Sequence, residues 1–219
     1  MSAAQLLAKE LKELSRNPTY HISLDNDNIF SWTLGLYIVN PDSPWNHAYL
    51  NAKMTFPSNY PFSPPSFKFT PSILHPNVYA DGRLCISILH EAGNIYQDEP
   101  SNENWSPAQG VESVILSIIS LLDDPNIQSP ANIEASNLWR DNREAYNAQV
   151  KKFVERSQQN IPSDFEVPSD NVFLNTGNQE EEDEWFFEDD SDDDDDEDQM
   201  SYEEDEAEMS EDYNDEDDK

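Results

Sequence analysis

The stretch HPNVYADGRLCISILH, residues 75–90, contains the only cysteine in a chain of 219 residues. Turn-forming residues precede Cys85, so we expect its side chain to be presented at an irregular segment. A free cysteine is more often a small buried hydrophobic residue than a reactive group. A nucleophilic cysteine needs a base or a cation nearby to supply its thiolate. The candidates within reach along the sequence are His75, Arg83 and His90.

A single cysteine cannot form an internal disulfide bond, and no Cys/His spacing typical of a zinc site is present. We therefore expect no metal and a reducing compartment. The most apolar run, Val114–Leu122, is nine residues long, far below the roughly 20 residues that span a bilayer. No charged-then-apolar leader opens the chain. The expectation is a soluble, unexported protein of the cytoplasm and nucleus.

Hydrophobic spacing predicts an α+β fold whose helices are segregated from one sheet. Leucines on one stripe indicate a helix over Ser2–Ser15, and a further helix is predicted over Asn142–Ser157. Ser106 is expected to cap a buried central helix with Pro107 at its first position, which leaves Gly110 in the first turn. Four β-rich stretches with short linkers favour an antiparallel meander: His21–Leu24, Phe30–Val39, Tyr49–Phe56 and Phe67–Phe69.

Acidic residues gather at the end of the chain. From Asn171 to Lys219 there are 26 acidic residues against one lysine, a net charge of -25, whereas the other 170 residues carry 20 acidic and 11 basic residues, a net charge of -9. Mutual repulsion opposes compaction, so we predict a folded domain over residues 1–165 and a disordered acidic tail over residues 166–219. Such a tail repels phosphate backbones and anionic lipids, which favours a basic protein as partner over nucleic acid or membrane.

Two loops stand out between these elements. Tyr60-Pro-Phe-Ser-Pro-Pro65 cannot be a central strand because prolines remove ladder donors, so we expect a rigid extended loop there. The segment between Leu89 and Trp105 is polar and longer than most loops.

Five motifs in a fixed order carry a resemblance to a known family. They are Tyr60-Pro-Phe-Ser-Pro-Pro65, His75-Pro-Asn77, Cys85 eight residues after that asparagine, Trp105-Ser-Pro107, and Leu121-Leu-Asp-Asp-Pro-Asn126. Together they resemble the ubiquitin-conjugating enzymes over about residues 4–158. The long loop after the cysteine, Ser129-Pro-Ala-Asn132 and the acidic tail are similar to the cell-division-cycle class, which works with cullin-RING ligases. The resemblance implies the ubiquitin-conjugating fold for residues 1–165.

The resemblance implies that Cys85 takes ubiquitin from the activating enzyme as a thioester and passes it to a lysine. It needs no cofactor of its own, because the activating enzyme uses the ATP. Asn77 matches the residue that stabilises the oxyanion or holds the loop in shape, and both roles stay open. Ser129 matches the gatekeeper position, and His75 with Pro76 matches a structural motif. The acids Asp98, Glu99 and Glu103 are expected to attract the incoming lysine, unless they form only a solvated loop.

Partner surfaces follow from the same resemblance. The expected contacts are Lys9, Lys12 and Arg16 for the activating enzyme; Phe62, Ser106, Pro107 and Ala108 for a RING ligase; and Leu116, Ser117 and Ser120 for the donor ubiquitin. Leu116 could equally belong to the core. The acidic tail is expected to speed encounter with a basic cullin surface, and protein substrates complete the partners.

The chain departs from the family at Trp45-Asn-His-Ala48, where relatives commonly carry Tyr-Glu-Gly-Gly. Two other functions are weighed against the enzyme. A non-catalytic ubiquitin-binding scaffold would be expected to lack Cys85. An acidic chaperone for basic proteins would need only the tail, whereas the ordered motifs indicate that the tail is an accessory.

Overall fold

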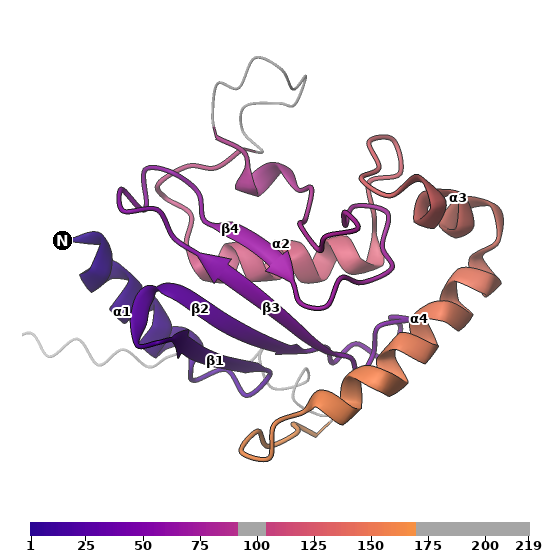
Figure 1. The fold of residues 1–219 in the computed structure, drawn as a ribbon, viewed down its shortest axis with the longest axis horizontal. Coiled ribbons are helices and arrows are strands. Elements are labelled where there is room, and N and C mark those ends of the chain that lie inside the picture. Colours follow the sequence, from indigo (N-terminus) through magenta and orange to yellow (C-terminus); the bar gives the residue numbers. More distant parts are fainter. Residues whose placement is uncertain (92–103, 170–219) are drawn as a thin grey trace, which may run out of the picture. The chain divides into compact units, whose positions relative to one another are not determined.

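The computed structural model describes residues 1–91 and 104–169, all within the first of two compact units, Met1–Gln179. The elements follow the order α1 (Ala3–Leu14), β1 (Tyr20–Asp25), β2 (Asn28–Tyr37), β3 (Tyr49–Thr55), β4 (Ser66–Phe69), the 3-10 helix η1 (Ser87–Leu89), α2 (Val111–Asp123), α3 (Ile133–Asp141), α4 (Arg143–Ser157) and the 3-10 helix η2 (Gln158–Asn160) (Figure 1). Residues 170–219, nearly all of the predicted tail, lie outside the described part, so the predicted boundary after residue 165 stays a prediction.

The four strands form one antiparallel sheet in the order β1-β2-β3-β4, which confirms the predicted meander. Alternation of side chains sends one set toward the core. In β2 this set is Trp32, Leu34 and Leu36, and in β3 it is Leu50, Ala52 and Met54, all fully buried. Leu34 pairs with Ala52 across the two strands, so the two apolar sets share one face.

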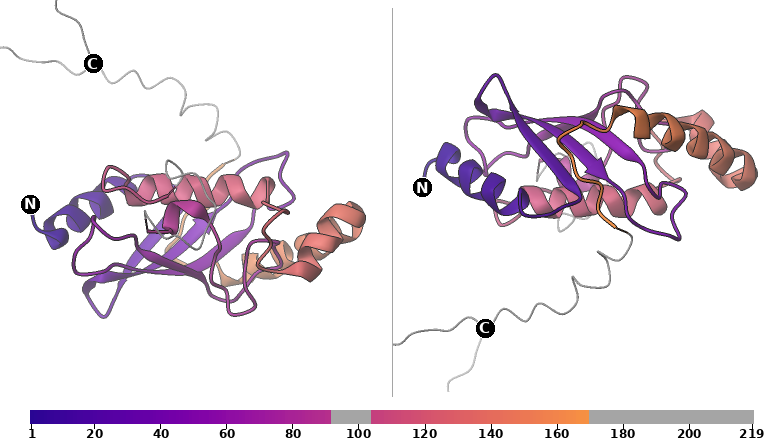
Figure 2. Two further views of the ribbon diagram at one scale, coloured as in Figure 1. Left: turned by 90° about the horizontal axis from the view of Figure 1, so that it is seen from above. Right: turned by 90° about the horizontal axis from the view of Figure 1, so that it is seen from below.

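Helix α2 covers that face of the sheet (Figure 2, left). Its sequence is apolar over most of its circumference, and five residues of the helix are buried in the main core: Val111, Val114, Ile115, Ile118 and Leu122. The predicted central buried helix is confirmed. Because η1 packs close to α2, the segment that contains Cys85 lies at the edge of the same core.

The predicted start of this helix was wrong. Helix α2 begins at Val111, not at Pro107, and Gly110 is its N-cap, not a residue of its first turn. The cause lies outside the local sequence, because a carboxylate oxygen of Glu10 in α1 accepts the Val111 N–H at 2.7 Å. Ser106 and Pro107 therefore belong to a loop.

Helix α3 was missed by the sequence analysis. It is nine residues long, and only Ala135 and Ser136 are buried in it. Such a short, polar helix shows no clear apolar stripe. Its start is marked by Asn132, whose side chain accepts the Ala135 N–H at 3.0 Å. An asparagine cap without a following stripe was too weak a signal on its own.

A C-terminal strap, residues 158–167, lies across the opposite face of the sheet (Figure 2, right). Ile161 and Phe165 pack there on a second apolar cluster made of Tyr37, Val39 and Tyr49. The ring centroids of Tyr49 and Phe165 are 5.4 Å apart. The folded part of the chain thus continues past the last α-helix.

Gly35 is required beneath this cluster. A Cβ atom at position 35 would lie 2.0 Å from the hydroxyl oxygen of Tyr49, so any larger residue would displace that ring. The Tyr49 hydroxyl shares a hydrogen bond of 3.0 Å with Nδ1 of His21 in β1, on the far side of β2. Burial, followed by the charge of Asp164, raises the pKa of Tyr49 to about 12.

Among the helices of the described residues, none is long and apolar enough to span a membrane.

Candidate active site around Cys85

The loop before Cys85 is anchored by a buried histidine. His75 Nε2 donates to the carbonyl oxygen of Leu121 at 2.9 Å, and its Nδ1 accepts the backbone N–H of Asn77 at 3.1 Å. Burial lowers the pKa of this imidazole to about 4. The ring is therefore neutral near pH 7 with its proton on Nε2, and neither nitrogen is left for proton transfer. This geometry supports the expected structural role of His75.

Asn77 joins this loop to the segment after α2. Its Nδ2 donates to the carbonyl oxygens of Asn126, at 2.9 Å, and Ser129, at 3.4 Å. Its Oδ1 accepts the Asn126 N–H at 2.9 Å. The side chain is buried, and both ends of its amide are engaged by backbone. The geometry favours the loop-holding role, while oxyanion stabilisation by Asn77 stays a prediction.

Cys85 is half-buried and follows this loop. Its backbone N–H donates to the carbonyl oxygen of Asn77 at 2.9 Å, and η1 begins two residues later. A left-handed Gly82, with φ of 91°, makes the preceding turn, where a Cβ would lie 2.2 Å from the carbonyl oxygen of Phe69. The cysteine is thus presented at an irregular segment, as the sequence predicts.

A depression of about 620 Å³ opens on one side of Cys85. Its lining combines apolar residues with cations: Pro64, Pro65, Ser66, Phe67, Lys68, Tyr79, Arg83, Leu84, Leu89, His90 and Glu91. The guanidinium of Arg83 lies 5.2 Å from the ring centre of Tyr79. The charge of the Cys85 thiolate and a hydrogen bond to its sulfur contribute to raising the pKa of Tyr79. The sulfur therefore has a phenol beside it.

A second depression, about 430 Å³, runs along the exposed side of α2. It is lined by Ile86, Leu116, Ser117, Ser120, Leu121 and Asp124. The three predicted donor-ubiquitin contacts therefore lie together in one groove that reaches the residue after Cys85. Leu116 is 54% exposed, so the alternative that it belongs to the core is wrong.

Comparison with known proteins identifies the family of this chain. Residues 6–154 match the ubiquitin-conjugating enzyme family. The chain belongs to this family. Its fold is the ubiquitin-conjugating fold, with an N-terminal helix, the four-stranded meander and the further helices that the resemblance implied.

Several ubiquitin-conjugating enzymes are similar to this chain. The 34-kDa enzyme E2-34 kDa of Saccharomyces cerevisiae is 51% identical over 173 residues, which cover 77% of this chain and 59% of the yeast protein. Enzyme E2 7 of Arabidopsis thaliana is 47% identical over 165 residues, covering 72% of this chain and 96% of its own length. The human enzyme E2 G2 is 41% identical over 160 residues, which cover 71% of this chain and 96% of the human protein. The yeast match supports the cell-division-cycle class.

The predicted RING contacts come from two loops that the structure holds side by side. Trp105 Nε1 donates to the carbonyl oxygen of Pro61 at 2.8 Å, and the Tyr60 and Trp105 rings lie 5.8 Å apart. Phe62, 76% exposed, projects from the first loop. Pro107 and Ala108 are exposed on the second, and Ser106 is half-buried. The four predicted contact residues therefore lie on adjacent loops and are all at least partly open to solvent.

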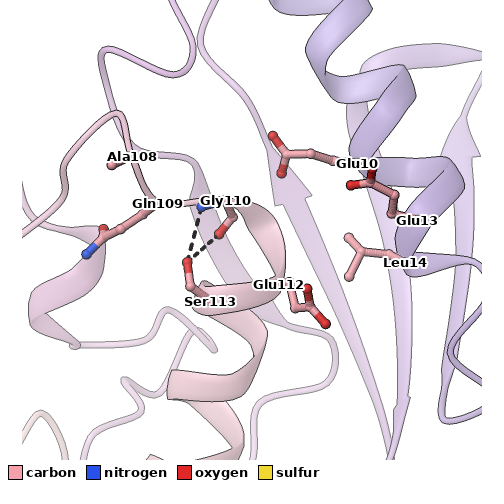
Figure 3. Close-up of a pocket in the computed structure, with 8 residues that line it drawn as sticks. All are labelled: Glu10, Glu13, Leu14, Ala108, Gln109, Gly110, Glu112 and Ser113. Carbon is pink, nitrogen blue, oxygen red and sulfur yellow. Dashed lines mark hydrogen bonds between the residues drawn. The ribbon is translucent and has the colours of Figure 1, made fainter. Parts of the chain in front are cut away.

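The predicted activating-enzyme contacts lie elsewhere, on α1 and the residues after it. Lys9, Lys12 and Arg16 are all exposed, and only Lys9 has a nearby acid on its own helix, Glu13 at 3.7 Å. The cavity between α1 and the start of α2, about 310 Å³, is acidic instead (Figure 3). It is lined by Glu10, Glu13, Leu14, Ala108, Gln109, Gly110, Glu112 and Ser113.

The acids predicted to attract the incoming lysine, Asp98, Glu99 and Glu103, lie outside the described residues. Ser129 is exposed, and its carbonyl oxygen, not its hydroxyl, accepts the hydrogen bond from Asn77.

Among residues 1–91 and 104–169, no group of three His, Cys, Asp or Glu side chains is placed to hold a metal ion.

Sequence reasoning missed the neighbours of the cysteine that come from outside its own stretch. Lys68 reaches the site because β4 forms a bridge with Arg83, and no local signal marks it. Tyr79 lies within the stretch, but no local sequence signal marks it as a neighbour of the sulfur. Asn126 belongs to a recognised motif, yet its pairing with Asn77 joins residues 49 positions apart.

Proposed function

We propose that the chain accepts ubiquitin from the activating enzyme as a thioester on Cys85 and transfers it to a lysine. The observation that carries this proposal is the position of a half-buried cysteine that lines one groove and is followed by Ile86 in the other, on a backbone held by Asn77. One groove accommodates the donor ubiquitin along α2. The other leaves a path for the acceptor.

Two acyl transfers make up the reaction. The Cys85 thiolate attacks the thioester carbonyl of the charged activating enzyme, whose own thiolate leaves. A lysine amine then attacks the new thioester, the carbon–sulfur bond breaks, and an isopeptide bond forms with loss of one proton from the amine. A lysine with a pKa near 10.4 is mostly protonated at neutral pH, so the site must favour the neutral amine and stabilise the oxyanion. His75 is engaged at both nitrogens and is assigned no base role.

We assign the lysine-attracting role to the acidic loop. Asp98, Glu99 and Glu103 supply negative potential, and Ser129 contacts the incoming amine without acting as a base. Replacing the three acids by Asn and Gln should slow discharge of ubiquitin to lysine and leave charging of Cys85 unchanged. If the triple variant discharges ubiquitin to lysine at the unchanged rate, the three acids have no role in the transfer.

The partners proposed beyond ubiquitin, the activating enzyme and a RING ligase are a cullin-RING ligase and its substrates, in cytoplasm and nucleus. The predicted acidic tail attracts a basic cullin surface by a long-range electrostatic force that weakens as the salt concentration rises. Deleting residues 170–219, which keeps the strap, should lower the association rate with the ligase and flatten its salt dependence. If neither the deletion nor the salt concentration changes the association rate with the ligase, the tail does not attract the cullin electrostatically.

The deciding experiment is a non-reducing gel of the full chain after reaction with activating enzyme, ubiquitin and ATP. The expected result is an adduct one ubiquitin heavier that disappears with thiol and is absent from Cys85→Ala. If no adduct forms although the activating enzyme is active, the proposed transfer function is wrong, and the ubiquitin-binding scaffold or the acidic chaperone would be favoured instead. Histone binding that survives removal of residues 1–165 would then favour the chaperone.

A further inference from the structure

One lysine of the chain lines the same depression as Cys85. Lys68, in β4, borders the depression of about 620 Å³ together with the cysteine, and no other lysine of the described residues does so. Its neighbours Phe67 and Phe69 are buried in the core. Alternation along the strand therefore places the Lys68 side chain on the opposite face of the sheet, where it is exposed to solvent.

The backbone of Lys68 is held between β3 and the segment that carries the cysteine. On one side it pairs with Lys53 of β3, and on the other it forms a bridge with Arg83, two residues before Cys85. The backbone N–H of Phe69 donates to the carbonyl oxygen of Gly82 at 2.9 Å, which ties the same two segments together. The separation of Lys68 from the cysteine is thus set by the fold, while the flexible stem of a lysine lets its amine move within the depression.

The Lys68 amine is not engaged in an ion pair. Lys53, its neighbour across the two strands, lies 2.7 Å from a carboxylate oxygen of Asp25. Within residues 1–91 and 104–169, Lys68 makes neither a hydrogen bond nor an ion pair through its side chain. The pKa of Asp81 is lowered first by its hydrogen bond to Arg83 and last by the charge of Lys68, so Arg83 is the partner of that carboxylate. The amine can therefore become a nucleophile without first breaking an ion pair.

The other lysines of the described residues lie on different elements. Lys9 and Lys12 are on α1, and Lys151 and Lys152 are on α4. None of them lines either depression beside the active-site segment. Position in the fold therefore distinguishes Lys68 from every other described lysine.

Because its amine shares the depression with the cysteine, we propose that Lys68 is a self-modification site, which accepts ubiquitin from the Cys85 thioester of the same chain. The neutral amine attacks the thioester carbonyl, the carbon–sulfur bond breaks, and an isopeptide bond forms. Cys85 leaves as its thiolate, and the proton lost by the amine passes to solvent. This inference rests on the proposed function. A nucleophile held beside its electrophile reacts at a high effective concentration, so Lys68 competes with acceptors that arrive from outside.

The test is a single-turnover reaction of the full chain, charged on Cys85 and then incubated without an added acceptor. The ubiquitin used has its lysines replaced by arginine, so that it cannot itself be the acceptor. The expected product is an adduct one ubiquitin heavier that resists thiol, and peptide mapping should place the isopeptide bond on Lys68. Lys68→Arg keeps the positive charge but removes the nucleophile, so the adduct formed per thioester should fall at least about tenfold.

Lys53→Arg is the matched control, because Lys53 is the neighbour of Lys68 in the sheet and does not line the depression. Its adduct should equal that of the native chain. A mixing experiment separates transfer within one chain from transfer between chains. Charged Lys68→Arg is added to uncharged Cys85→Ala, which offers Lys68 but cannot carry ubiquitin, and the second chain should stay unmodified.

Three outcomes would overturn the self-modification. They are an equal adduct in Lys68→Arg, an isopeptide bond mapped to another lysine such as Lys219, and modification of Cys85→Ala in the mixture to the level of the native chain. A thioester that forms and persists without a thiol-resistant adduct would also overturn it, while leaving the proposed function intact. If the native chain forms no thioester, the proposed function itself fails, which is a different result from the other four.

Discussion

The residues before Cys85 show which functions of a side chain can be foreseen. The motif was recognisable from sequence because His, Pro and Asn stand at fixed spacing from the cysteine. The roles depend on partners about 50 positions away, which spacing cannot reveal. His75 reaches Leu121 and Asn77 reaches Asn126 only in the folded chain. Residue types therefore predicted the site, whereas the hydrogen bonds that distinguish structural from catalytic roles needed the structure.

The burial of His75 predicts a pH-dependent loss of stability. Its pKa falls from about 6.5 in the unfolded chain to about 4 in the fold, so the unfolded state binds the proton first as pH decreases. The stabilising contribution is complete above about pH 6.5 and is lost as pH falls toward 4, at up to about 1.4 kcal/mol per pH unit. Urea unfolding of the native chain and of His75→Gln between pH 7.5 and 4 measures this.

The difference between those two curves isolates the histidine from the carboxylates, which titrate in both proteins. His75→Gln should be less stable near pH 7 but should lose stability less steeply below pH 6.5. Parallel curves would mean that the imidazole accepts its proton in the folded chain as readily as in the unfolded one.

Asn77 gives a second prediction at this scale. Asn77→Ala leaves the N–H and carbonyl of Asn126 without their buried partner, which should cost roughly 2–4 kcal/mol of unfolding free energy. Asn77→Asp keeps an acceptor for that N–H and should recover part of the loss. Hydrogen exchange at Asn126 should rise in the order native, Asp, Ala. Charging of Cys85 should survive, since the cysteine bonds to the Asn77 backbone; loss of charging together with unchanged exchange would contradict the loop-holding role.

At the level of elements, helices and strands with clear periodicity were predictable, and their ends were not. The leucine stripe of α1 and the alternation of apolar and polar residues in β2 and β3 are strong local signals, and the structure forms these elements where the signals predict them. The start of α2 is set by Glu10, about 100 positions earlier in the sequence. The N-cap residue, Gly110, has no side chain, so the sequence carries no capping signal there. Helix α3 is too short and polar for its pattern to stand out.

Glu10 should therefore contribute more to stability than its neighbours on the helix. Its carboxylate accepts the Val111 N–H at the positive end of α2 and the hydroxyl of Tyr60 at 2.9 Å. Glu10→Ala should lower the free energy of unfolding by about 1–3 kcal/mol. Glu13→Ala, in the same cavity wall (Figure 3) but paired only with Lys9 at the surface, should change it by a few tenths. Equal effects in thermal unfolding would show that α2 is capped in another way.

On the scale of the whole molecule, composition predicted an acidic end to the chain, but not where folded structure stops. The resemblance ends near residue 158, whereas the strap packs on the sheet through Ile161 and Phe165. The strap is mostly polar, and only two of its apolar side chains, Ile161 and Phe165, pack on the sheet. These two side chains are partly buried only because Tyr37 and Tyr49, on the face of the sheet away from the main core, provide a surface for them.

Phe165→Ala should uncover the outer face of the sheet. Loss of a partly buried phenylalanine should cost about 1–2 kcal/mol of unfolding free energy, with faster hydrogen exchange in β1–β3. Absorbance titration should find the pKa of Tyr49, now about 12, shifted toward 10, because the burial that raises it is the leading cause. Val167→Ala is the control and should alter neither measurement. An unmoved tyrosine titration would show that the strap does not cover Tyr49.

The strap also determines how the molecule responds to mechanical load. A pull on the end of the chain acts first on residues 158–167, which lie across the strands and are held by Phe165, Ile161 and the hydrogen bond from Gln158 to the carbonyl of His47. These contacts would be loaded one after another, in a peeling direction, whereas the sheet is loaded only after the strap has come away. Tension transmitted by a bound partner would therefore detach the strap and leave α2, the Asn77 loop and Cys85 in place.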